Sequence, residues 1–422
     1  MATAIAWVVF GAFAGLTVMQ TAYVWMYCRF LRSKTRAQVD GNFEPKAAIV
    51  LCLRGSDPTL QNCLTSLTQI EYADYEIHVV VDEELDPALD TVRKCFPAES
   101  ELTPVIHVIR DKSDSRSLKC SAILTALANM DDAVEVVALI DADSIADSNW
   151  LKDLVHPLAD PSVGATTGNR WFTPTTSEMG SLIRQYWNAA AIAQMSIYQI
   201  PWGGSLAMKR STISRCKLDE TWNTAFCEDT MLTARLRTEG LRVVRVPDLI
   251  IANSESTKLS EAFRWIVRQL LTVRLYHPDW PLVLVHALFL GACLLTAAVS
   301  IGTFVVGNEI RAAVIVFAGV LIYNVTNAIL LRAIVSGNER AILTRGTPLQ
   351  PTRLSGFSVV AGILLTQLIQ PVAAVTAGLT RKISWRGITY QIKSNRQIEM
   401  IRYQPFREVL DRREGAENQS ID

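Results

Sequence analysis

The sequence predicts an α/β domain with a mostly parallel sheet, attached to membrane-crossing segments. Three short Val/Ile/Leu-rich runs, 48–53, 76–81 and 134–140, lie within 45–250, where such runs alternate with amphipathic stretches. This alternation is typical of parallel strands that are buried on both faces. Outside this region lie four apolar segments, each long enough to span a hydrocarbon core that takes about 20 helical residues.

The composition agrees with a protein that lies partly in a membrane. Of 422 residues, 50% are hydrophobic and only 19% are charged. A chain of this length holds one catalytic domain of ordinary size and further segments besides. Lys+Arg and Asp+Glu both number 41, so no overall positive field selects nucleic acid as a partner. The eight cysteines form no CxxC pair, so neither a zinc site nor a disulfide framework is predicted.

The first apolar segment runs from Ala4 to Cys28 and is followed at once by basic residues. A cleaved signal peptide has its charges before a shorter apolar stretch, so the pattern favours a retained anchor in residues 1–30. Because cytosolic flanks carry an excess of Lys and Arg, we expect the C-terminal side of the anchor in the cytosol. The basic residues that follow the segment are Arg29, Arg32, Lys34 and Arg36.

Residues 45–258 are expected to form the α/β domain, and two of its predicted strands end in acidic side chains. The run 76–81 is followed by Asp82, and the run 134–140 by Asp141. Ligands of open α/β sheets bind beyond the carboxyl ends of the strands, so these acids are candidate ligand contacts.

The sharpest motif is a hydrophobic strand that ends in Asp141 and Asp143, one residue apart. Alternation along a strand puts both carboxylates on one side of the chain. Two hard oxygen ligands at this place suit Mg²⁺ or Mn²⁺, held together with the phosphate oxygens of a nucleotide. The alternative is a solvated turn, although a turn acid rarely follows such an apolar strand.

A second acidic pair, Glu228 and Asp229, opens an amphipathic stretch from Thr230 to Leu236. Acids in the first turn of a helix can simply complement the helix dipole. Alternatively, Asp229 is a general base that accepts the proton of an attacking hydroxyl. The residues alone leave both interpretations open.

Paired glycines follow a tryptophan in the segment Trp202-Gly203-Gly204. Glycines permit close approach of the backbone to a ligand, and a tryptophan can stack on the face of a sugar. A simple turn between two elements is the alternative interpretation of this segment, and it stands beside the functional one.

The stretch 259–279 is amphipathic and is expected to form an interfacial helix before the next membrane segment. It carries Trp265, Arg268 and Gln269. Its arginines are either ordinary interfacial anchors or partners of a diphosphate leaving group, which a forked guanidinium can bind.

Residues 280–380 contain three apolar segments, expected to insert in the membrane because the rest of the chain cannot cover them. Three full crossings would place the basic tail, 381–422, on the opposite side of the membrane from the α/β domain. Pro371 lies inside the last segment, and we therefore expect a broken or re-entrant hairpin there, packed against protein. The apolar segments are 280–306, 312–335 and 357–379, and Arg340, Arg345 and Arg353 lie in the connection before the last of them.

These motifs, in this order and spacing, resemble those of the ceramide glucosyltransferase family, within the inverting GT-A glycosyltransferases. The similarity covers roughly residues 45–278 and begins at 53–60, Leu-Arg-Gly-Ser-Asp-Pro-Thr-Leu, which is similar to the family's Lys-Gly-x-Asp-Pro segment. The tail segment 383–390, Ile-Ser-Trp-Arg-Gly-Ile-Thr-Tyr, is similar to one in bacterial members and in related hopanoid-associated glycosyltransferases.

The resemblance implies a GT-A domain, a Rossmann-like fold for nucleotide-diphospho-sugars, with an N-terminal transmembrane anchor and C-terminal transmembrane helices. It implies a metal-dependent inverting hexosyltransferase that moves one sugar, usually glucose from UDP-glucose, to the hydroxyl of a membrane lipid such as ceramide, as in sphingolipid metabolism. The implied cofactor is Mg²⁺ or Mn²⁺. The implied place is a membrane, the inner or plasma membrane in a bacterium, with the catalytic domain cytosolic.

The resemblance also assigns roles to individual residues. Asp229 is the expected catalytic base, Arg268 is expected at the leaving group, and Asp141 and Asp143 are expected to bind the metal. The expected nucleotide-sugar contacts are Arg54, Asp82, Glu83, Lys119, Asp141, Gly204 and Gln269, and the expected acceptor contacts are Trp202, Gly203, Glu228 and Trp265. At two positions the sequence departs from the family: Gln269 replaces the tryptophan of the (Q/R)xxRW motif, and Glu83 aligns with the family's first aspartate.

Two other functions remain open on the sequence. A processive polysaccharide synthase that exports its polymer needs a channel of several crossing helices and normally an intact QxxRW motif. A catalytically silent scaffold or a transporter should carry its ionisable residues inside the membrane segments. Here the conspicuous acids lie in the α/β region instead, so we predict transfer of a single sugar to a lipid.

Overall fold

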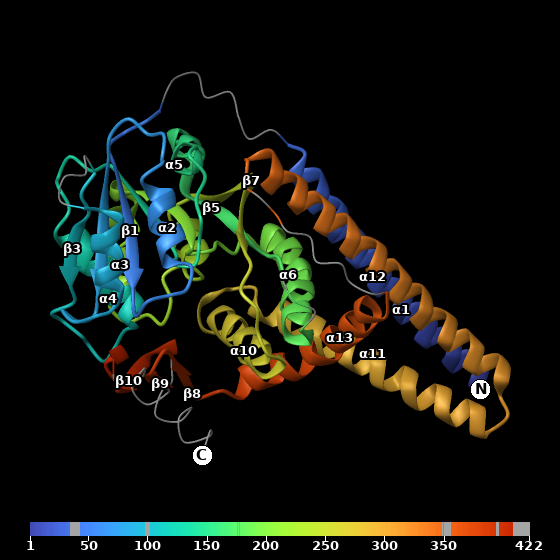
Figure 1. Cartoon of the computed structure of the whole chain (residues 1–422). Helices are drawn as coiled ribbons and strands as arrows, with labels where there is room; N and C mark the ends of the chain where they lie inside the picture. The colour runs from blue at the N-terminus through green and yellow to red at the C-terminus, as the bar shows by residue number, and fades with distance from the viewer. Residues whose placement is uncertain are drawn as a thin grey trace, which may run out of the picture.

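The computed structural model places an α/β domain beside a group of long apolar helices (Figure 1). The structure describes residues 1–33, 43–97, 102–174, 176, 178–347, 349, 356–393 and 396–407. Three of the basic residues used to predict topology, Lys34, Arg36 and Arg353, lie outside the described residues, as does the end of the tail, 408–422.

A seven-stranded sheet forms the centre of the domain, in the order β3-β2-β1-β4-β6-β5-β7. The three predicted strands are confirmed as β1 (Ala47–Leu53), β2 (Tyr75–Val81) and β4 (Val136–Ile140), and β1 pairs in parallel with the other two. β6 (Ser205–Lys209) runs antiparallel to its neighbours, so the sheet is mostly parallel, as predicted. The remaining strands are β3 (Val105–Val108), β5 (Val163–Phe172) and β7 (Arg242–Asn253).

Helices cover both faces of this sheet because alternate side chains of its central strands are apolar. In β4, Val137 and Leu139 join the buried cluster beneath α4, whereas Val136, Ala138 and Ile140 join the cluster beneath α2, α3 and α5. The short helices of the domain are α2 (Leu60–Leu67), α3 (Ala88–Cys95), α4 (Leu118–Ala128), α5 (Trp150–Val155), η1 (His156–Ala159), α7 (Arg210–Arg215), α8 (Leu218–Trp222) and α9 (Leu232–Thr238).

The parallel order of the central strands places three functional segments together. Because β1, β2 and β4 run in the same direction, the residues that follow them, Arg54, Asp82 and Asp141, meet at one edge of the sheet. This edge is where ligands of open α/β sheets bind.

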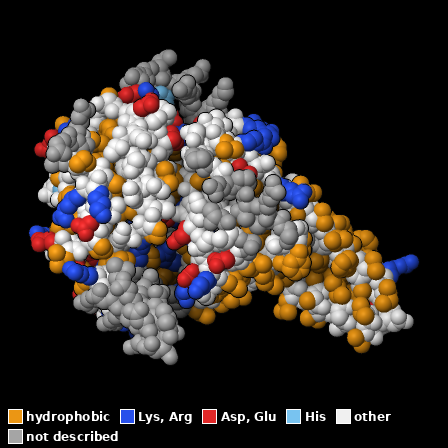
Figure 2. Space-filling model, viewed as in Figure 1, with side chains coloured by type: hydrophobic (Ala, Val, Ile, Leu, Met, Phe, Trp, Pro, Cys, Tyr) orange, Lys and Arg blue, Asp and Glu red, His pale blue; other side chains and the backbone are white. Residues whose placement is uncertain are grey.

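The described residues contain four helices that are long and apolar enough to cross a membrane. On the face that Figure 2 shows, hydrophobic side chains predominate over these helices, in contrast to the mixed charges of the α/β domain. The four predicted apolar segments lie within these helices, which are α1 (Ala2–Leu31), α11 (Trp280–Val306), α12 (Ile310–Thr344) and α13 (Gly356–Leu379).

Two further helices form a layer between the sheet and the apolar helices (Figure 1). α6 (Met179–Tyr198) packs against both β5 and α13, and α10 (Leu259–Tyr276) packs against α6 and α13. The amphipathic stretch predicted after Leu259 is thus a helix whose buried face touches α6 and α13.

The expected break at Pro371 is wrong, because α13 continues through it as one helix. Proline in a helix interior removes one backbone hydrogen bond and crowds the preceding turn. In α13 the proline ring faces Gly291 of α11, where the absence of a side chain lets the two helices approach closely.

The chain nevertheless contacts the α/β domain both before and after α13. Arg345, eleven residues before the helix begins, pairs with Asp147 and Asp153, and Arg386, seven residues after it ends, pairs with Asp57. The tail therefore returns to the domain by way of an unbroken helix rather than a hairpin.

The tail forms a small antiparallel sheet of β8 (Lys382–Trp385), β9 (Ile388–Ile392) and β10 (Ile398–Arg402). Its buried side chains, among them Ile388 and Tyr390, join the same hydrophobic cluster as α4. The sequence analysis predicted no strands in this segment.

Candidate active site

A cavity of about 380 Å³ lies at the carboxyl ends of β1 and β4, between the domain, α10 and the tail sheet. Nearly all of the predicted site residues line this cavity, although they come from distant parts of the chain. Glu83 does not line it, although it lies beside Asp82. The predicted residues that line it are Arg54, Asp82, Lys119, Asp141, Asp143, Trp202, Gly203, Gly204, Glu228, Asp229, Trp265, Arg268 and Gln269.

The two aspartates that end β4 have different surroundings. Asp141 accepts a hydrogen bond of 2.6 Å from Lys119. Asp143 accepts one of 3.0 Å from Asn253 through Oδ2, while its Oδ1 is buried and has no partner among the described residues. Burial acts to raise the pKa of both carboxyls, but Lys119 and Arg170 reverse the effect at Asp141, whose pKa is lowered. The pKa of Asp143 is raised.

This pair fits a divalent cation that also binds phosphate. The described residues contain no group of three or more His, Cys, Asp or Glu side chains that could enclose a metal ion alone. Mg²⁺ commonly takes only one or two carboxylates, with substrate phosphates and water as its other ligands. The unpartnered Oδ1 of Asp143 is a carboxylate oxygen free for such a role.

Lys119 links the metal-site candidates to the second acidic pair. Its Nζ lies 2.6 Å from Asp141 Oδ1 and 2.6 Å from Glu228 Oε1. Burial raises the pKa of Glu228 to about 7, with Lys119 opposing the shift and Asp229 and Asp141 adding to it. Burial also raises the pKa of Asp229. The buried carboxyl of Glu228, next to the half-buried Asp229 and one ammonium, can therefore hold a proton close to neutral pH.

Asp229 lies before α9 and is held by backbone groups rather than by a cation. Its Oδ2 accepts from Gly203 N at 2.9 Å, and its Oδ1 accepts from Thr230 N at 2.6 Å. α9 begins only at Leu232. The carboxylate orientation is thus fixed by two N–H groups, an arrangement suited to a base that must face a substrate.

Both glycines of the Gly-Gly pair lie too close to the acids to carry a side chain. A Cβ on Gly203 would lie 1.8 Å from Glu228 Oε1, and a Cβ on Gly204 would lie 2.4 Å from Asp141 Oδ2. The segment is therefore a close approach of backbone to the two acidic pairs, which a simple turn would not require.

Aromatic rings and guanidinium groups form the opposite wall. Arg170 lies over Trp202 and Trp265, at 5.3 and 5.6 Å from the ring centres. Arg268 lies 4.7 Å from the ring centre of Trp385 and forms no ion pair with any described residue. Burial lowers the pKa of Arg268 to about 10, and the nearby Arg170 and Arg386 add to this. An unpaired, partly buried guanidinium is suited to an anionic ligand.

The other end of the cavity holds Asp82, which is buried and ion-paired with Arg54. The hydroxyl of Tyr403, from the tail, lies 3.0 Å from Asp82 Oδ2 and 2.7 Å from Glu83 Oε1. Oδ1 of Asp82 has no hydrogen-bond partner among the described residues. One acceptor oxygen is therefore available here for a ligand.

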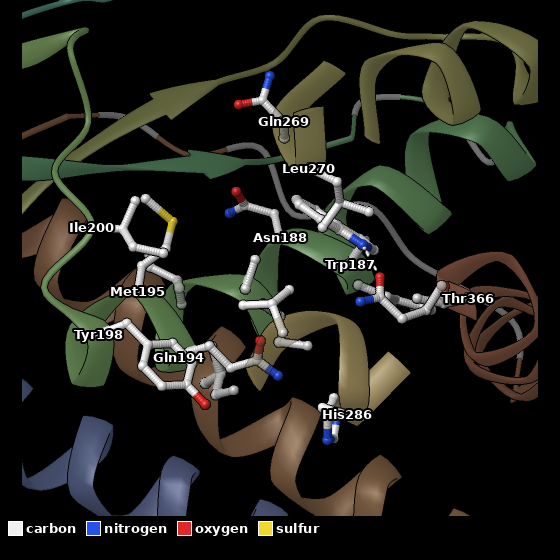
Figure 3. Close-up of a pocket in the computed structure, with 18 of the residues that line it drawn as sticks. Trp187, Asn188, Gln194, Met195, Tyr198, Ile200, Gln269, Leu270, His286 and Thr366 are labelled. Atoms are coloured by element: carbon white, nitrogen blue, oxygen red, sulfur yellow. Dashed lines mark hydrogen bonds between the residues drawn. The ribbon is translucent and has the colours of Figure 1, made fainter. Parts of the chain in front are cut away.

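A second cavity, of about 200 Å³, adjoins the first and lies among α1, α6, α10, α11, α12 and α13. Side chains from α6, α10, α11 and α13 converge on it in Figure 3, including Asn188, Gln194, His286 and Thr366. The two cavities share lining residues, namely Arg170, Trp202, Asp229, Trp265, Gln269 and Thr272. Asp229 can therefore be approached both from the carboxyl edge of the sheet and from among the apolar helices.

Several residues of the site were missed by sequence reasoning. Arg170 lies within β5, where no motif marks it. Arg386 belongs to the tail segment that is similar to bacterial family members. The sequence of this segment does not reveal that it folds back onto the end of β1. Asp57 belongs to the segment 53–60 that resembles the family, but the resemblance assigns it no role. Only contacts between distant segments reveal these residues.

Among solved structures, the mannosyltransferase PcManGT from Pyrobaculum calidifontis, in complex with GDP-Man and Mn²⁺, is similar to this chain. The similarity covers 80% of this chain and 99% of PcManGT, with a TM-score of 0.53 and 19% sequence identity. This likeness confirms the predicted GT-A fold. Glucosyl-3-phosphoglycerate synthase from Mycobacterium tuberculosis, in complex with Mn²⁺ and UDP, matches 54% of the chain and 79% of its own, with a TM-score of 0.35 and 15% identity. A search of curated proteins finds no match.

The family comparison covers nearly the whole chain. The sequence profile of glycosyl transferase family 21 matches residues 11–398, from the first apolar helix to the tail sheet. This match agrees with the resemblance to ceramide glucosyltransferases, and it includes both cavities and the apolar helices around the second. The chain belongs to glycosyl transferase family 21 and is a glycosyltransferase.

Proposed function

We propose that this glycosyltransferase moves one hexose, glucose from UDP-glucose in the first instance, onto the hydroxyl of a membrane lipid. The observation that carries the proposal is the position of Asp229, which lines both the cavity at the sheet edge and the cavity among the apolar helices. A polar donor at the sheet edge and a lipid acceptor among the apolar helices can thus both reach the carboxylate of Asp229.

The donor is proposed to bind in the first cavity, with its nucleoside near Asp82 and its diphosphate near Asp141 and Asp143. The two aspartates would hold Mg²⁺ or Mn²⁺, which supplies positive charge to the diphosphate as it leaves. Arg268, unpaired among the described residues, adds a second cation on the opposite wall. Both interactions strengthen as negative charge builds on the leaving oxygen, which is the condition for catalysis rather than simple binding.

Asp229 is proposed to act as the general base. The acceptor oxygen bonds to the anomeric carbon while the bond from that carbon to the diphosphate breaks, and the hydroxyl proton passes to Asp229. A single displacement of this kind inverts the anomeric centre. The hydrogen bonds from Gly203 and Thr230 keep the carboxylate oriented while it waits for the proton.

The second cavity is suited to a lipid that carries several hydrogen-bonding groups. Its walls come from apolar helices, yet they present many amide side chains. Gln367 is buried, and its Oε1 has no hydrogen-bond partner among the described residues, so an N–H or O–H of a ligand would satisfy it. Ceramide, with one amide and two hydroxyls, is a lipid of this kind. The amide side chains are Gln20, Asn169, Asn188, Gln194, Gln269, Asn327, Gln367 and Gln370.

The orientation proposed for the protein has the α/β domain in the cytosol. Basic residues lie at the two helix ends that lead to the domain or contact it. They are Arg29 and Arg32 at the end of α1, and Arg340 and Arg345 at the end of α12. An excess of basic residues marks the cytosolic side of a membrane protein. This placement also gives the domain access to cytosolic nucleotide sugars.

The proposal is tested by incubating membranes that contain the protein with labelled nucleotide sugars and Mn²⁺, then extracting the lipids. A labelled, lipid-soluble product is expected, and Asp229→Asn should reduce its formation by about two to four orders of magnitude, the usual contribution of a general base. Asp219→Asn, at an exposed position on α8, is the matched control and should leave the rate unchanged.

Two results would contradict the proposal. An ethanol-insoluble labelled polymer would indicate a processive polysaccharide synthase. Product formation by Asp229→Asn at the parental rate, with equal amounts of protein in the membranes, would remove Asp229 from the mechanism.

A further inference from the structure

The turn between β8 and β9 brings a cation to the mouth of the first cavity. Trp385 pairs with Ile388, so the turn consists of Arg386 and Gly387 alone. Both residues have positive φ, +47° and +79°. Two-residue hairpin turns with this backbone favour Asn, Asp or Gly, because other side chains are strained in the left-handed region. An arginine at the first position is an outlier, and such outliers often mark functional positions.

The turn is docked on the loop that follows β1. Arg386 donates through Nη1 to Arg54 O and through Nη2 to Asp57 Oδ2, each at 2.9 Å. In return, Arg54 Nε donates to Arg386 O at 2.9 Å. Arg386 and its neighbour Trp385 therefore line the cavity, although they come from the tail.

Arg170, Arg268 and Arg386 are three of the guanidinium groups that line the cavity, and Arg170 and Arg386 lie close enough to Arg268 to lower its pKa. Arg170 and Arg386 have carboxylate partners, Asp143 and Asp57, whereas Arg268 has only the ring of Trp385 among the described residues. Like charges in a partly buried space repel one another unless an anion lies between them. The diphosphate of a nucleotide sugar is an anion with oxygens for several forked donors.

We propose that the β8–β9 turn is part of the donor site, with Arg386 binding the diphosphate and Trp385 positioning Arg268 beside it. The inference rests on the nucleotide-sugar donor proposed above. A bound diphosphate would lie between the two aspartates of β4 and the turn, so that the tail closes the side of the cavity opposite the metal. The role of Arg386 is to bind the donor, and that of Trp385 is to orient another residue.

The experiment measures binding of UDP, GDP and uridine to the purified full-length protein with Mn²⁺, by isothermal titration. Removing one charge-assisted, forked contact should weaken diphosphate binding about 10-fold to 100-fold. Arg386→Ala should therefore lose UDP or GDP affinity by this factor while its uridine affinity stays unchanged. Arg386→Lys, which keeps the charge but not the fork, should fall in between. Arg402→Ala, exposed on β10 of the same sheet, is the matched control.

A purely structural role for Arg386 predicts a different pattern. Asp57→Asn weakens the same ion pair but leaves the guanidinium present, so it should lose less diphosphate affinity than Arg386→Ala if Arg386 binds the donor. If Asp57→Asn loses as much affinity as Arg386→Ala, or if UDP and uridine lose affinity equally, the inference is overturned. Unchanged UDP and GDP binding by Arg386→Ala also overturns it. If the unaltered protein binds neither UDP nor GDP, the proposed donor fails, and this inference fails with it.

Discussion

At the scale of residues, Lys119 determines the electrostatics of the site. Its ammonium group lies between Asp141 and Glu228, which would otherwise be two anions in a partly buried space. Burial raises the pKa of Glu228 and of Asp229 although Lys119 opposes the shift, whereas at Asp141 the nearby Lys119 and Arg170 outweigh burial and the pKa is lowered. Groups whose surroundings push their pKa values apart are the usual basis for different roles in one site.

The first prediction concerns Asp143. Asp143→Ala removes the carboxylate that has one oxygen without a hydrogen bond among the described residues, and with it a ligand of the proposed metal. Transfer should fall by about two to three orders of magnitude, the usual cost of losing a principal charge stabiliser. The measurement is the initial rate over a series of Mn²⁺ concentrations. A variant that keeps both the parental rate and the parental metal dependence would exclude Asp143 as a ligand.

The second prediction concerns pH. Burial raises the pKa of Glu228 to about 7, far above the usual value of about 4.3. Asp229 must be ionised to accept a proton, and burial raises its pKa as well, so kcat/KM should fall towards acidic pH as Asp229 takes up a proton. Glu228→Gln removes a negative neighbour of Asp229, so the acid limb should move to lower pH. An acid limb that stays in place in Glu228→Gln would show that Glu228 does not influence the base.

The sequence predicted the acidic residues of the site because each follows a strand or opens a helix in a recognisable motif. Asp82 and Asp141 directly follow strands, and Asp229 precedes an amphipathic stretch. It did not predict Arg170 or Arg386. Their function depends on which segments lie opposite them, and that is decided by packing of the whole chain rather than by local pattern.

At the scale of elements, the strands and apolar helices were predictable because their patterns are strong and local. β1, β2 and β4 differ from their predicted bounds by one or two residues, which is the normal uncertainty of strand ends. The tail sheet was not predicted, because its strands are only four or five residues long. They are stable because Ile388 and Tyr390 bury themselves in the cluster beneath α4.

The error at α13 has a specific cause. The hairpin is predicted because three full crossings would carry the basic tail away from the domain, and Pro371 is the place in the segment where a helix hydrogen bond is lost. Helices beside a proline can compensate for this loss in a packed bundle. Pro371 packs closely against Gly291, a residue of another helix that the local pattern does not reveal.

At the scale of the whole molecule, one arginine ties the apolar helices to the α/β domain. Arg345 follows α12, and its side chain is largely shielded from solvent, with bonds of 2.6 and 2.8 Å to Asp147 and one of 2.8 Å to Asp153. These two carboxylates belong to the domain, in the segment that includes α5. The pairing therefore fixes the position of the domain relative to the helices that line the second cavity.

The next prediction tests this connection. Arg345→Ala leaves two carboxylates without their cation, and the free energy of unfolding should fall by about 2 kcal/mol, less than for a fully buried pair because both acids keep some solvent contact. The thermal midpoint of the purified protein measures the effect. Arg340→Ala is the control, since among the described residues its exposed side chain bonds only to the carbonyl of Ser336 in its own helix. Equal midpoints for the two variants would show that Arg345 does not hold the domain in place.

Because of the position of the second cavity, the concentrations of the two substrates are set in two different phases. Because its walls come largely from α6, α10 and the apolar helices, the proposed lipid acceptor would arrive by lateral diffusion within the lipid phase. Its abundance is then a mole fraction of the surrounding lipids, whereas that of the donor is a molarity in water. Diluting the bilayer with inert lipid would therefore starve the enzyme of acceptor, even when the amount of acceptor in each millilitre is constant.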